Sequence, residues 1–421
     1  MRSTVGKLLY YIFARLYPFA IKLVSPINEK ARLWVNGRKQ VLVRMKNTMD
    51  ANDKIIWMHC SSLGEFEQGR PLLEKLKSHY PSYKILLTFF SPSGYEVRKN
   101  YEGADYIFYL PVDTEQNASK FFDAARPQLI VFVKYEFWYH YLNEAKKRKI
   151  PLLLISAIFR RNQPFFSRFG SFHRSMLACF SHLFVQNEDS VTLLATIGFT
   201  GNVTLSGDTR FDRVIEIAES FQPISLIESF CEGSIVVVAG STWLQDDKQL
   251  ARYVNTRTHV KFIIAPHDIA KDRLEECNKR YKGSILFSSL NNASPKAGFN
   301  TIIIDNVGML SRLYKYATIC YVGGGFGKDG VHNVLEAAVY GKPVVYGPEY
   351  KKFNEAIELI TSGGGVSAKN GLELEKIFDN LLTETSAYSL KAKSAFQYVY
   401  SKKGSTEKIL QFIYENRLLT N

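Results

Sequence analysis

The sequence is poor in cysteine, and its cysteines form no recognisable pairs. There are five, an odd number, at Cys60, Cys179, Cys231, Cys277 and Cys320. No pair has the short spacing of a metal-ligand motif, so neither a metal centre nor a disulfide framework is expected. We therefore expect reduced core thiols in a cytosolic setting. The position of Cys60 leaves a nucleophilic role open, but no other feature of the sequence supports one.

Acidic residues are also in deficit. The 40 acidic and 54 basic side chains give a formal net charge of +14. A charge of this size favours an anionic partner, which could be a nucleic acid, an acidic lipid or a phosphorylated substrate. The apolar and charged fractions are those of a folded protein, and no internal repeat or low-complexity segment stands out.

A long uninterrupted apolar run is missing as well. Residues 5–25 are apolar and aromatic, but Lys7, Arg15 and Lys22 interrupt them. As a helix, the stretch between the two lysines would rise about 21 Å, less than the roughly 30 Å of a hydrocarbon core. Arg15 would add roughly 2.5–3.5 kcal/mol to full insertion. We therefore expect an amphipathic helix that lies in the membrane surface as an anchor, followed by basic residues suited to anionic headgroups. A helix docked on the protein itself is the alternative.

The remaining chain predicts an α/β protein with two domains. A chain of 421 residues is expected to form two domains of about 200 residues each. Apolar strands alternate with helical stretches, which indicates parallel sheets covered on both faces. The strands are expected at 55–60, 84–90, 106–110, 129–133, 152–156, 183–186, 203–206, 235–239, 262–265, 284–287, 301–304, 319–322 and 343–346.

The predicted fold consists of two doubly wound, Rossmann-like domains with a ligand-binding cleft between them. We expect residues 1–50 to form the anchor helix and basic segment, 51–220 the first domain and 221–421 the second. Phe221-Gln-Pro223 is a plausible linker. The C-terminal helix could pack back on the first domain.

A glycine-rich loop at 323–330 follows the strand at 319–322 and precedes an expected helix at 331–340. Glycines permit backbone conformations that turn N–H groups toward an anion, and the helix would add its positive end. Asn333 and Glu336 would share the loop-facing side of that helix with His332. A carboxylate there could accept both hydroxyls of a ribose whose phosphate rests on the loop. The stretch therefore predicts a phosphate cradle for a mononucleotide-linked donor.

Two other interpretations of the loop stay open. Gly325-Phe-Gly327-Lys-Asp-Gly330 satisfies the dinucleotide fingerprint, and Glu349 lies where a ribose-binding acid would be expected. The glycines could bind NAD, or they could form only a tight turn, with Glu336 an ordinary surface residue.

Two acidic residues follow strands of the first domain. Glu65 could take a proton from a substrate hydroxyl, or it could be an ordinary acid at a helix start near Ser62. Glu136 could orient a sugar or the base, or it could be a structural partner of Lys134. Both acids are expected at the same sheet edge.

Other motifs lie at expected strand ends or between strands. Four arginines interleave with four phenylalanines and could bind lipid phosphates while the rings meet acyl chains, or bind single-stranded nucleic acid: Arg160, Arg161, Arg168 and Arg174, with Phe165, Phe166, Phe169 and Phe172. Three turns of the second domain could contact a phosphate or a base: Gly240-Ser241-Thr242, Pro266-His267 and Asp305-Asn-Val-Gly308-Met309.

These motifs together resemble the 3-deoxy-D-manno-octulosonic acid (Kdo) transferases, which modify lipid A. The resemblance covers nearly the whole chain. It is carried by Trp57 with the segment His59 to Pro71, Glu136-Phe-Trp138, Gln186-Asn-Glu-Asp189, Gly207-Asp-Thr-Arg-Phe-Asp212, Gly240-Ser-Thr242, Pro266-His267, Asn306-Val-Gly308 and Gly330-Val-His-Asn-Val-Leu-Glu336.

The resemblance implies a GT-B fold and an inverting, metal-independent transfer of Kdo from CMP-Kdo to a lipid A precursor (lipid IVA) in lipopolysaccharide biosynthesis. No cofactor is implied, CMP-Kdo is a co-substrate, and nucleic acid is not an expected partner. The location would be the cytoplasmic face of the inner membrane. Two alternatives are a GT-B transferase that uses a UDP-sugar, and a non-catalytic protein that binds anionic lipid or nucleic acid.

The resemblance also assigns roles. Glu65 would be the catalytic base, with Glu136 assisting at the acceptor or sugar site. The donor would be bound by Arg210, Ser241, Thr242, Pro266, His267, Gly308, Met309, Gly325, Asn333 and Glu336. The chain departs from the family pattern at Arg210, where lysine is frequent, and at Pro266-His267-Asp268, where Pro-Arg-His is common.

Overall fold

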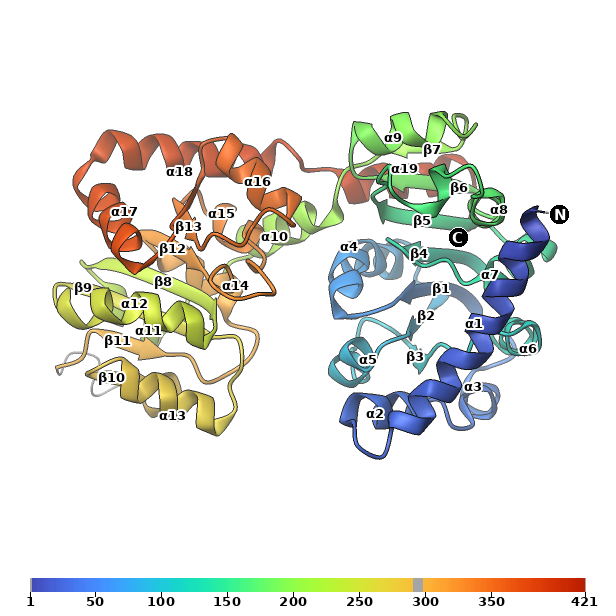
Figure 1. Ribbon diagram of the computed structural model, residues 1–421, viewed down its shortest axis with the longest axis horizontal. Coiled ribbons are helices and arrows are strands. Elements are labelled where there is room, and N and C mark those ends of the chain that lie inside the picture. The colour runs from blue at the N-terminus through green and yellow to red at the C-terminus, as the bar shows by residue number, and fades with distance from the viewer. Residues whose placement is uncertain (1, 291–297, 421) are drawn as a thin grey trace. The chain divides into compact units, whose positions relative to one another are not determined.

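The computed structural model describes residues 2–290 and 298–420. The chain divides into two compact units. The first comprises Met1–Arg213 together with Gly404–Asn421, and the second comprises Val214–Lys403. Figure 1 shows a parallel sheet with helices on both sides in each unit.

In the first unit, the described residues form a seven-stranded parallel sheet with the order β3-β2-β1-β4-β5-β6-β7. Its strands are β1 (Lys54–Cys60), β2 (Tyr83–Phe89), β3 (Tyr106–Tyr109), β4 (Pro127–Val133), β5 (Leu152–Ala157), β6 (His182–Val185) and β7 (Val203–Leu205). The helices between them are α4 (Leu63–His79), α5 (Pro92–Arg98), α6 (Glu115–Ala125), α7 (Tyr139–Lys147), α8 (Ser171–Leu177) and α9 (Glu188–Ala195). The helix α10 (Thr209–Glu219) leads into the second unit.

Two apolar clusters cover the two faces of this sheet. On one face, Trp57 of β1 packs edge-on against Phe132 and Tyr141, with ring centroids 5.2 and 5.8 Å apart. On the other face, α4 packs with the C-terminal helix α19 (Ser405–Glu415), whose Ile409 and Ile413 are fully buried. The C-terminal helix therefore belongs to the first unit. Figure 1 shows α4 and α5 on one side of the sheet and α6 and α7 on the other.

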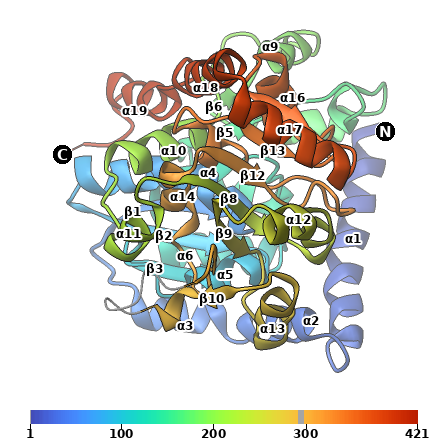
Figure 2. The ribbon, with the colours of Figure 1, turned by 90° about the vertical axis from the view of Figure 1, so that its left-hand side faces the viewer.

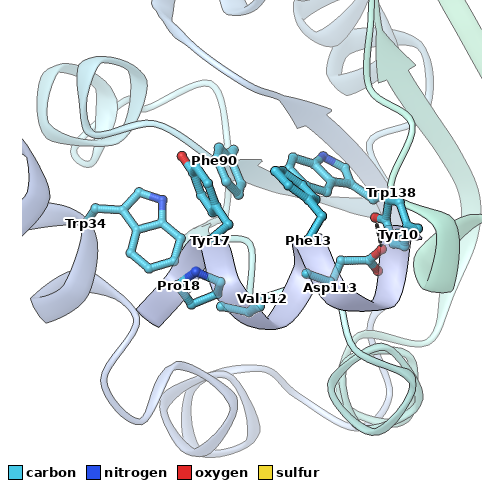
Figure 3. Close-up of a pocket in the computed structure, with 10 residues that line it drawn as sticks. Tyr10, Phe13, Tyr17, Pro18, Trp34, Phe90, Val112, Asp113 and Trp138 are labelled. Carbon is cyan, nitrogen blue, oxygen red and sulfur yellow. Dashed lines mark hydrogen bonds between the residues drawn. The ribbon is translucent and has the colours of Figure 1, made fainter. Parts of the chain in front are cut away.

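Three helices precede the sheet: α1 (Arg2–Val24), α2 (Glu29–Gly37) and α3 (Val41–Thr48). Figure 2 shows α1 as the long blue helix that leads into α2. One face of α1 docks on the first unit, where the Tyr10 hydroxyl donates a hydrogen bond to Asp113. Tyr17 stacks on Phe90 at 5.9 Å between centroids, and Phe90 stacks on Trp138 at 4.4 Å. Figure 3 shows these rings around a small aromatic pocket under α1.

The other face of α1 is apolar and open to solvent. Its exposed side chains are Leu8, Leu9, Ile12, Leu16, Phe19 and Leu23. None of the helices in the described part of the chain is long and apolar enough to cross a bilayer. The helix is therefore docked on the protein by one face, while its opposite face has the composition expected of a surface anchor.

In the second unit, the described residues form another seven-stranded parallel sheet, with the order β10-β11-β9-β8-β12-β13-β14. Its strands are β8 (Ile235–Thr242), β9 (Val260–Pro266), β10 (Ser284–Leu286), β11 (Thr301–Ile303), β12 (Ile319–Val322), β13 (Val344–Tyr346) and β14 (Gly365–Ser367). Its helices are α11 (Ser225–Cys231), α12 (Leu244–Thr256), α13 (Lys271–Arg280), α14 (Leu310–Leu313), α15 (Leu335–Ala338), α16 (Asn354–Thr361), α17 (Gly371–Thr383) and α18 (Thr385–Tyr400). Residues of α12, α13 and α17 share one core cluster on this sheet (Figure 2).

The glycine-rich stretch differs from its prediction. The helix expected at 331–340 is only α15, four residues long. Before it the backbone is held by neighbouring segments, because Val331 N donates to Glu349 O and His332 N donates to Gly323 O. A dinucleotide fingerprint requires a helix that starts at the last glycine, so the NAD interpretation lacks its structural context.

Candidate active site

The first sheet reverses its strand order between β1 and β4. β2 and β3 lie beyond β1, and β5, β6 and β7 lie beyond β4. The chain segments leaving these two strands at their carboxyl ends diverge, and doubly wound sheets bind ligands at that edge. Glu65 follows β1 and Glu136 follows β4. Both acids therefore belong to the edge where a ligand is expected.

Glu65 lies in the first turn of α4, whose N-cap is Ser62. The Ser62 hydroxyl donates a hydrogen bond to Glu65 Oε2 instead of capping the helix backbone. The Glu65 side chain is half-buried and forms no ion pair with any residue in the described ranges. Its place at the sheet edge suits a base, and the Ser62 bond is the local contact of an ordinary first-turn acid. The catalytic role stays a prediction.

Cys60 ends β1 between the two acids and is fully buried. Burial, and next the negative charges of Glu65 and Glu136, raise the pKa of its thiol well above the ordinary value. Both carboxylates therefore lie within electrostatic reach of one sulfur atom. The thiolate form that a nucleophile needs is disfavoured here, so the geometry gives no support to a nucleophilic Cys60.

Glu136 is buried, and its contacts are to aromatic side chains. His59 Nε2 lies 3.1 Å from Glu136 Oε2, and Trp138 Nε1 donates to the same oxygen over 2.6 Å. These two side chains, rather than Lys134, are its partners. Trp138 and His59 were not assigned roles from the sequence, although both lie inside the recognised motifs.

Arg210, predicted to bind the donor phosphate, lies in the first unit. Its Nε and Nη2 donate to Asp208 Oδ2 over 2.9 and 2.8 Å, and its backbone N donates to Oδ1 over 2.9 Å. Burial alone would raise the pKa of Asp208. Its pKa instead lies below the ordinary value, because the Arg210 charge and hydrogen bonds outweigh burial. The guanidinium is thus already held by a carboxylate.

The arginine- and phenylalanine-rich segment differs partly from its prediction. Arg160, Arg161 and Arg168 are exposed, whereas Arg174 Nη1 donates to the carbonyls of Phe165 and Ser167. The rings of Phe165 and Phe172 are buried in the core, and Phe169 is 69% exposed. Three arginines are thus exposed and their predicted lipid contact stays a prediction, while Arg174 holds the loop backbone and two of the rings are part of the core.

The second sheet reverses its strand order between β8 and β12. Ser241 and Thr242 end β8, and the glycine-rich loop begins directly after β12. Gly323 packs so closely on the Ser241 carbonyl that a Cβ at Gly323 would lie 2.3 Å from its oxygen. The Thr242 Oγ1 is buried without a hydrogen-bond partner among the described residues. This edge therefore combines a glycine-dependent turn with an unsatisfied hydroxyl.

The glycine-rich loop encloses an anion that belongs to the chain itself. Gly324 N and Trp243 N donate to Asp246 Oδ2 over 2.8 and 2.9 Å, and the Tyr321 hydroxyl donates to Oδ1 over 2.7 Å. Asp246 is fully buried, and burial raises its pKa despite these bonds. Gly323 N is also occupied, since it donates to the Gly240 carbonyl. The amides of Gly323 and Gly324 thus hold the protein's own backbone and carboxylate, not an external phosphate.

Three aromatic side chains form a stack at the same edge. The centroids of His267 and His332 lie 4.4 Å apart with rings 15° from parallel, and Trp243 stacks on His267 at 4.6 Å. Trp243 Nε1 donates to His332 Nε2 over 2.8 Å, so Nε2 carries no proton. Burial, and next the His267 charge, lowers the pKa of His332 to about 4. The stack is thus a neutral aromatic surface of the kind on which a nucleobase packs.

The remaining predicted donor residues lie near the C-terminal ends of the second-unit strands. Asn333 Nδ2 donates to Glu336 Oε1 over 3.0 Å. Burial, and next the Glu336 charge, raise the pKa of Tyr314 and that of Tyr340. Of the others, Pro266 ends β9, and Gly308 is exposed with a φ of +92°. Met309 is buried, and Gly325 is buried in the glycine-rich loop. Sequence reasoning missed Trp243 and Asp246, although an acid three residues into a helix start is a recognisable signal.

The family model and two curated relatives carry the same family description. The family described as 3-deoxy-D-manno-octulosonic-acid transferase (kdotransferase) matches residues 36–213. A 3-deoxy-D-manno-octulosonic acid transferase of Aquifex aeolicus is 28% identical over 345 residues, which cover 80% of this chain and 89% of that protein. The enzyme of the same name from Haemophilus influenzae is 23% identical over 375 residues, covering 85% and 86%.

A third relative is longer than this chain. A bifunctional glycosyltransferase/methyltransferase of Fusobacterium nucleatum is 26% identical over 416 residues. The match covers 96% of this chain but only 61% of the Fusobacterium protein.

Among solved structures, UDP-GlcNAc 2-epimerase of Neisseria meningitidis has a TM-score of 0.61 at 16% identity, covering 86% of this chain and all of that one (100%). MurG of Acinetobacter baumannii has a TM-score of 0.54 at 10% identity, covering 86% and 99%. At these identities the likeness shows the fold alone: two parallel-sheet α/β domains of the GT-B type.

Proposed function

Because the chain belongs to the Kdo transferase family of glycosyltransferases, we propose that it transfers Kdo from CMP-Kdo to a lipid A precursor such as lipid IVA. The family places the enzyme in Kdo transfer for lipopolysaccharide biosynthesis. The donor, the acceptor, the lack of a metal requirement and the inner-membrane location are our proposals.

The observation that carries this proposal is that each of the two sheets has a candidate site at its own strand-order reversal. The first sheet has Glu65 and Glu136 at its reversal, and the second has the Trp243–His267–His332 stack at its own. Acids beside a sheet edge suit activation of a hydroxyl, and a neutral aromatic stack suits a pyrimidine base. A glycosyltransferase with a nucleotide-linked donor needs both.

In the proposed reaction, a hydroxyl oxygen of the acceptor attacks the anomeric carbon of Kdo. The new C–O bond forms as the bond from that carbon to the CMP phosphate oxygen breaks, with inversion at the carbon. Glu65 accepts the hydroxyl proton, and CMP leaves with the bonding electron pair. The negative charge that develops on the phosphate needs positive or N–H partners. Since two of the loop's amides are already occupied, Thr242 Oγ1 becomes the more important candidate donor on the chain.

Incubation with CMP-Kdo, generated in situ, and a lipid A precursor tests the function. We expect the lipid to gain mass in steps of one Kdo residue, measured by mass spectrometry, and the gain to persist in the presence of EDTA. A lipid that stays unmodified under these conditions would contradict the proposal.

The donor is tested separately by thermal shift. CMP should raise the melting temperature of the protein, and UDP should do so less, if the aromatic stack binds cytosine of the donor. A larger effect of UDP would favour the UDP-sugar alternative. A salt-dependent complex with RNA and no response to CMP would favour the alternative of a non-catalytic protein that binds nucleic acid.

The outer face of α1 supports the proposed membrane location. Leu9 and Leu16, seven residues apart, lie on one face and are 61% and 58% exposed. Arg15 and Lys22 are exposed as well, and anionic headgroups attract such charges. A contiguous exposed apolar face of this kind is uncommon on a soluble monomer without a binding role.

Replacing Leu9 and Leu16 together with glutamate should weaken binding to anionic vesicles at least tenfold, since each buried leucine contributes about 1.5–3 kcal/mol. Co-flotation with vesicles that contain phosphatidylglycerol measures this. The matched control is Leu372→Glu, an equally exposed leucine (59%) on α17 of the second unit. Equal flotation of the α1 variant and the control would contradict the role of this face.

A further inference from the structure

A line of hydrogen bonds runs across the first sheet and ends at Glu136. Trp57 Nε1–H donates to Thr88 Oγ1 over 2.8 Å. Thr88 Oγ1 lies 2.8 Å from His59 Nδ1, and on the other side of that ring Nε2 lies 3.1 Å from Glu136 Oε2. Trp57, Thr88 and His59 are fully buried. Bulk solvent does not reach these positions, so the direction of each bond is argued from the groups themselves.

The Glu136 carboxylate decides the direction, although two contacts of the His59 ring oppose it. Nδ1 lies 3.2 Å from the Thr88 carbonyl oxygen, and Trp138 Nε1, which donates to Glu136 Oε2 over 2.6 Å, also lies 3.1 Å from His59 Nε2. The Thr88 oxygen accepts the Trp57 hydrogen, and its own hydroxyl hydrogen can be donated to His59 Nδ1 when the ring proton is on Nε2. Nδ1 then carries the lone pair, and the ring proton is on Nε2, where it points at Glu136 Oε2. The opposite tautomer would place the Nε2 lone pair against a carboxylate oxygen, which is repulsive.

The result is a carboxylate that is fixed by one of its two oxygens. Oε2 accepts from His59 and, over 2.6 Å, from Trp138 Nε1. No residue in the described ranges donates to Oε1, and the side chain as a whole is only 7% exposed. Two N–H donors on one oxygen are a charge-assisted arrangement that holds the carboxylate in place. The free oxygen is left to accept a hydrogen from outside the chain.

We propose that His59, Thr88 and Trp138 are positioning residues that hold Glu136 as a fixed acceptor for a hydroxyl of the transferred sugar. The proposal rests on the proposed function, which supplies a polyhydroxylated substrate. Glu136 binds and orients in this scheme, while the proton of the reacting hydroxyl goes to Glu65. Glu136, which His59 and Trp138 hold in place, is thus the acid that orients the sugar.

Two substitutions remove a hydrogen-bonding group and keep an apolar or aromatic side chain in its place. Trp138→Phe deletes the Nε1–H but keeps an aromatic ring beside Phe90, whose centroid lies 4.4 Å from that of Trp138 in the wild type. Thr88→Val deletes the hydroxyl at nearly constant volume. We expect each to lower kcat/KM for CMP-Kdo about tenfold, the value of one charge-assisted hydrogen bond. The CMP-induced thermal shift should be unchanged, because CMP lacks the sugar.

Conservative variants separate positioning from general damage. Thr88→Ser keeps the hydroxyl and should restore most of the rate. Thr88→Val also leaves the Trp57 N–H unpaired, so the melting temperature of each variant is measured beside its rate. A structural role alone would make rate follow stability in this set.

The tautomer of His59 gives a readout that does not depend on activity. Long-range nitrogen–proton spectra of protein labelled with ¹⁵N-histidine should show the Nε2–H form in the wild type, with His59 assigned by the loss of its signals in His59→Gln. In Thr88→Val the proton should stay on Nε2, because the Glu136 carboxylate still faces that nitrogen. An Nδ1–H form in the wild type would overturn the proposed relay, even if the protein proved to have no Kdo transferase activity.

The activity outcomes are equally separable. Transfer by the wild type with both variants within about twofold of its rate would refute the positioning role and leave the function standing. Failure of Thr88→Ser to restore the rate lost in Thr88→Val would refute it as well. No transfer by the wild type would refute the proposed function, and the tautomer would then decide on the relay alone.

Discussion

Glu65→Gln is expected to lower Kdo transfer by about 10²–10⁴-fold, the usual contribution of a positioned general base. Glutamine keeps an oxygen that can accept the Ser62 hydrogen bond, so the first turn of α4 should keep its structure. The measurement is the initial rate of lipid modification at saturating donor. CMP should raise the melting temperature of this variant as it does that of the wild type, because the predicted nucleotide-binding residues other than Arg210 lie in the second unit.

Glu67→Gln is the matched control for this variant. Glu67 lies on the same helix two positions on, where it faces away from Glu65 and pairs with Arg98 over 2.8 Å. Its substitution should leave the rate nearly unchanged. If Glu65→Gln kept more than about a tenth of the wild-type rate, the proton would have to go elsewhere, and the assignment of Glu65 as the base would be wrong.

Asp246→Ala is expected to destabilise the second unit by about 3 kcal/mol or more, because it removes the acceptor of three buried donors. Gly324 N, Trp243 N and the Tyr321 hydroxyl would each lose a partner around a fully buried side chain, and each such loss costs about 1–3 kcal/mol. The melting transition should fall by roughly 6–12 °C for a domain of this size. The thermal shift caused by CMP should disappear, since Trp243 belongs to the aromatic stack.

Two further variants test the explanation for Asp246. Asp246→Asn keeps one oxygen that can accept from both backbone N–H groups, so its loss of stability should be clearly smaller than that of the alanine variant. Asp272, also early in its helix and exposed on α13, forms no hydrogen bond or ion pair with a residue in the described ranges. Asp272→Ala should therefore melt as the wild type does. If Asp246→Ala did the same, the glycine-rich loop would not depend on this carboxylate.

The strands could be predicted because their signal is local. In both sheets, apolar runs of four to eight residues are typical of buried parallel strands, and the predicted strands match β1 to β13 within a few residues. β14 was missed, because Gly365–Ser367 is short and follows two glycines, so that it carries no apolar run. Its pairing with β13 is a property of the assembled sheet.

The error in the glycine-rich stretch has a tertiary cause. Residues 331–340 contain good helix formers, yet the backbone of Val331 and His332 bonds to Glu349 and Gly323, residues distant in sequence. Asn333 Oδ1 then accepts from Leu335 N, a local bond that competes with a helical turn. Such bonds have no periodicity in the sequence, so hydrophobic pattern alone could not reveal them.

The positions of single acids were easier to predict than their partners. Glu65 and Glu136 follow apolar strands directly, and that order along the chain fixes the sheet edge at which they lie. The contacts of Glu136 with His59 and Trp138 depend on the pairing of β1 with β4 and on the rotamers of two rings. The same holds for Asp246, whose partners Trp243, Tyr321 and Gly324 come from three different segments.

The docked face of α1 has a practical consequence for anyone who wishes to handle the protein without detergent. Deleting α1 to remove its exposed leucines would also remove Tyr17 from the rings of Phe90 and Trp34. Those rings would then be exposed, so the truncated protein would have a new apolar surface in place of the old one. Substituting the exposed positions of α1 with polar residues instead keeps the helix packed on the first unit. The helix that carries the exposed leucines thus also covers aromatic side chains of the first unit.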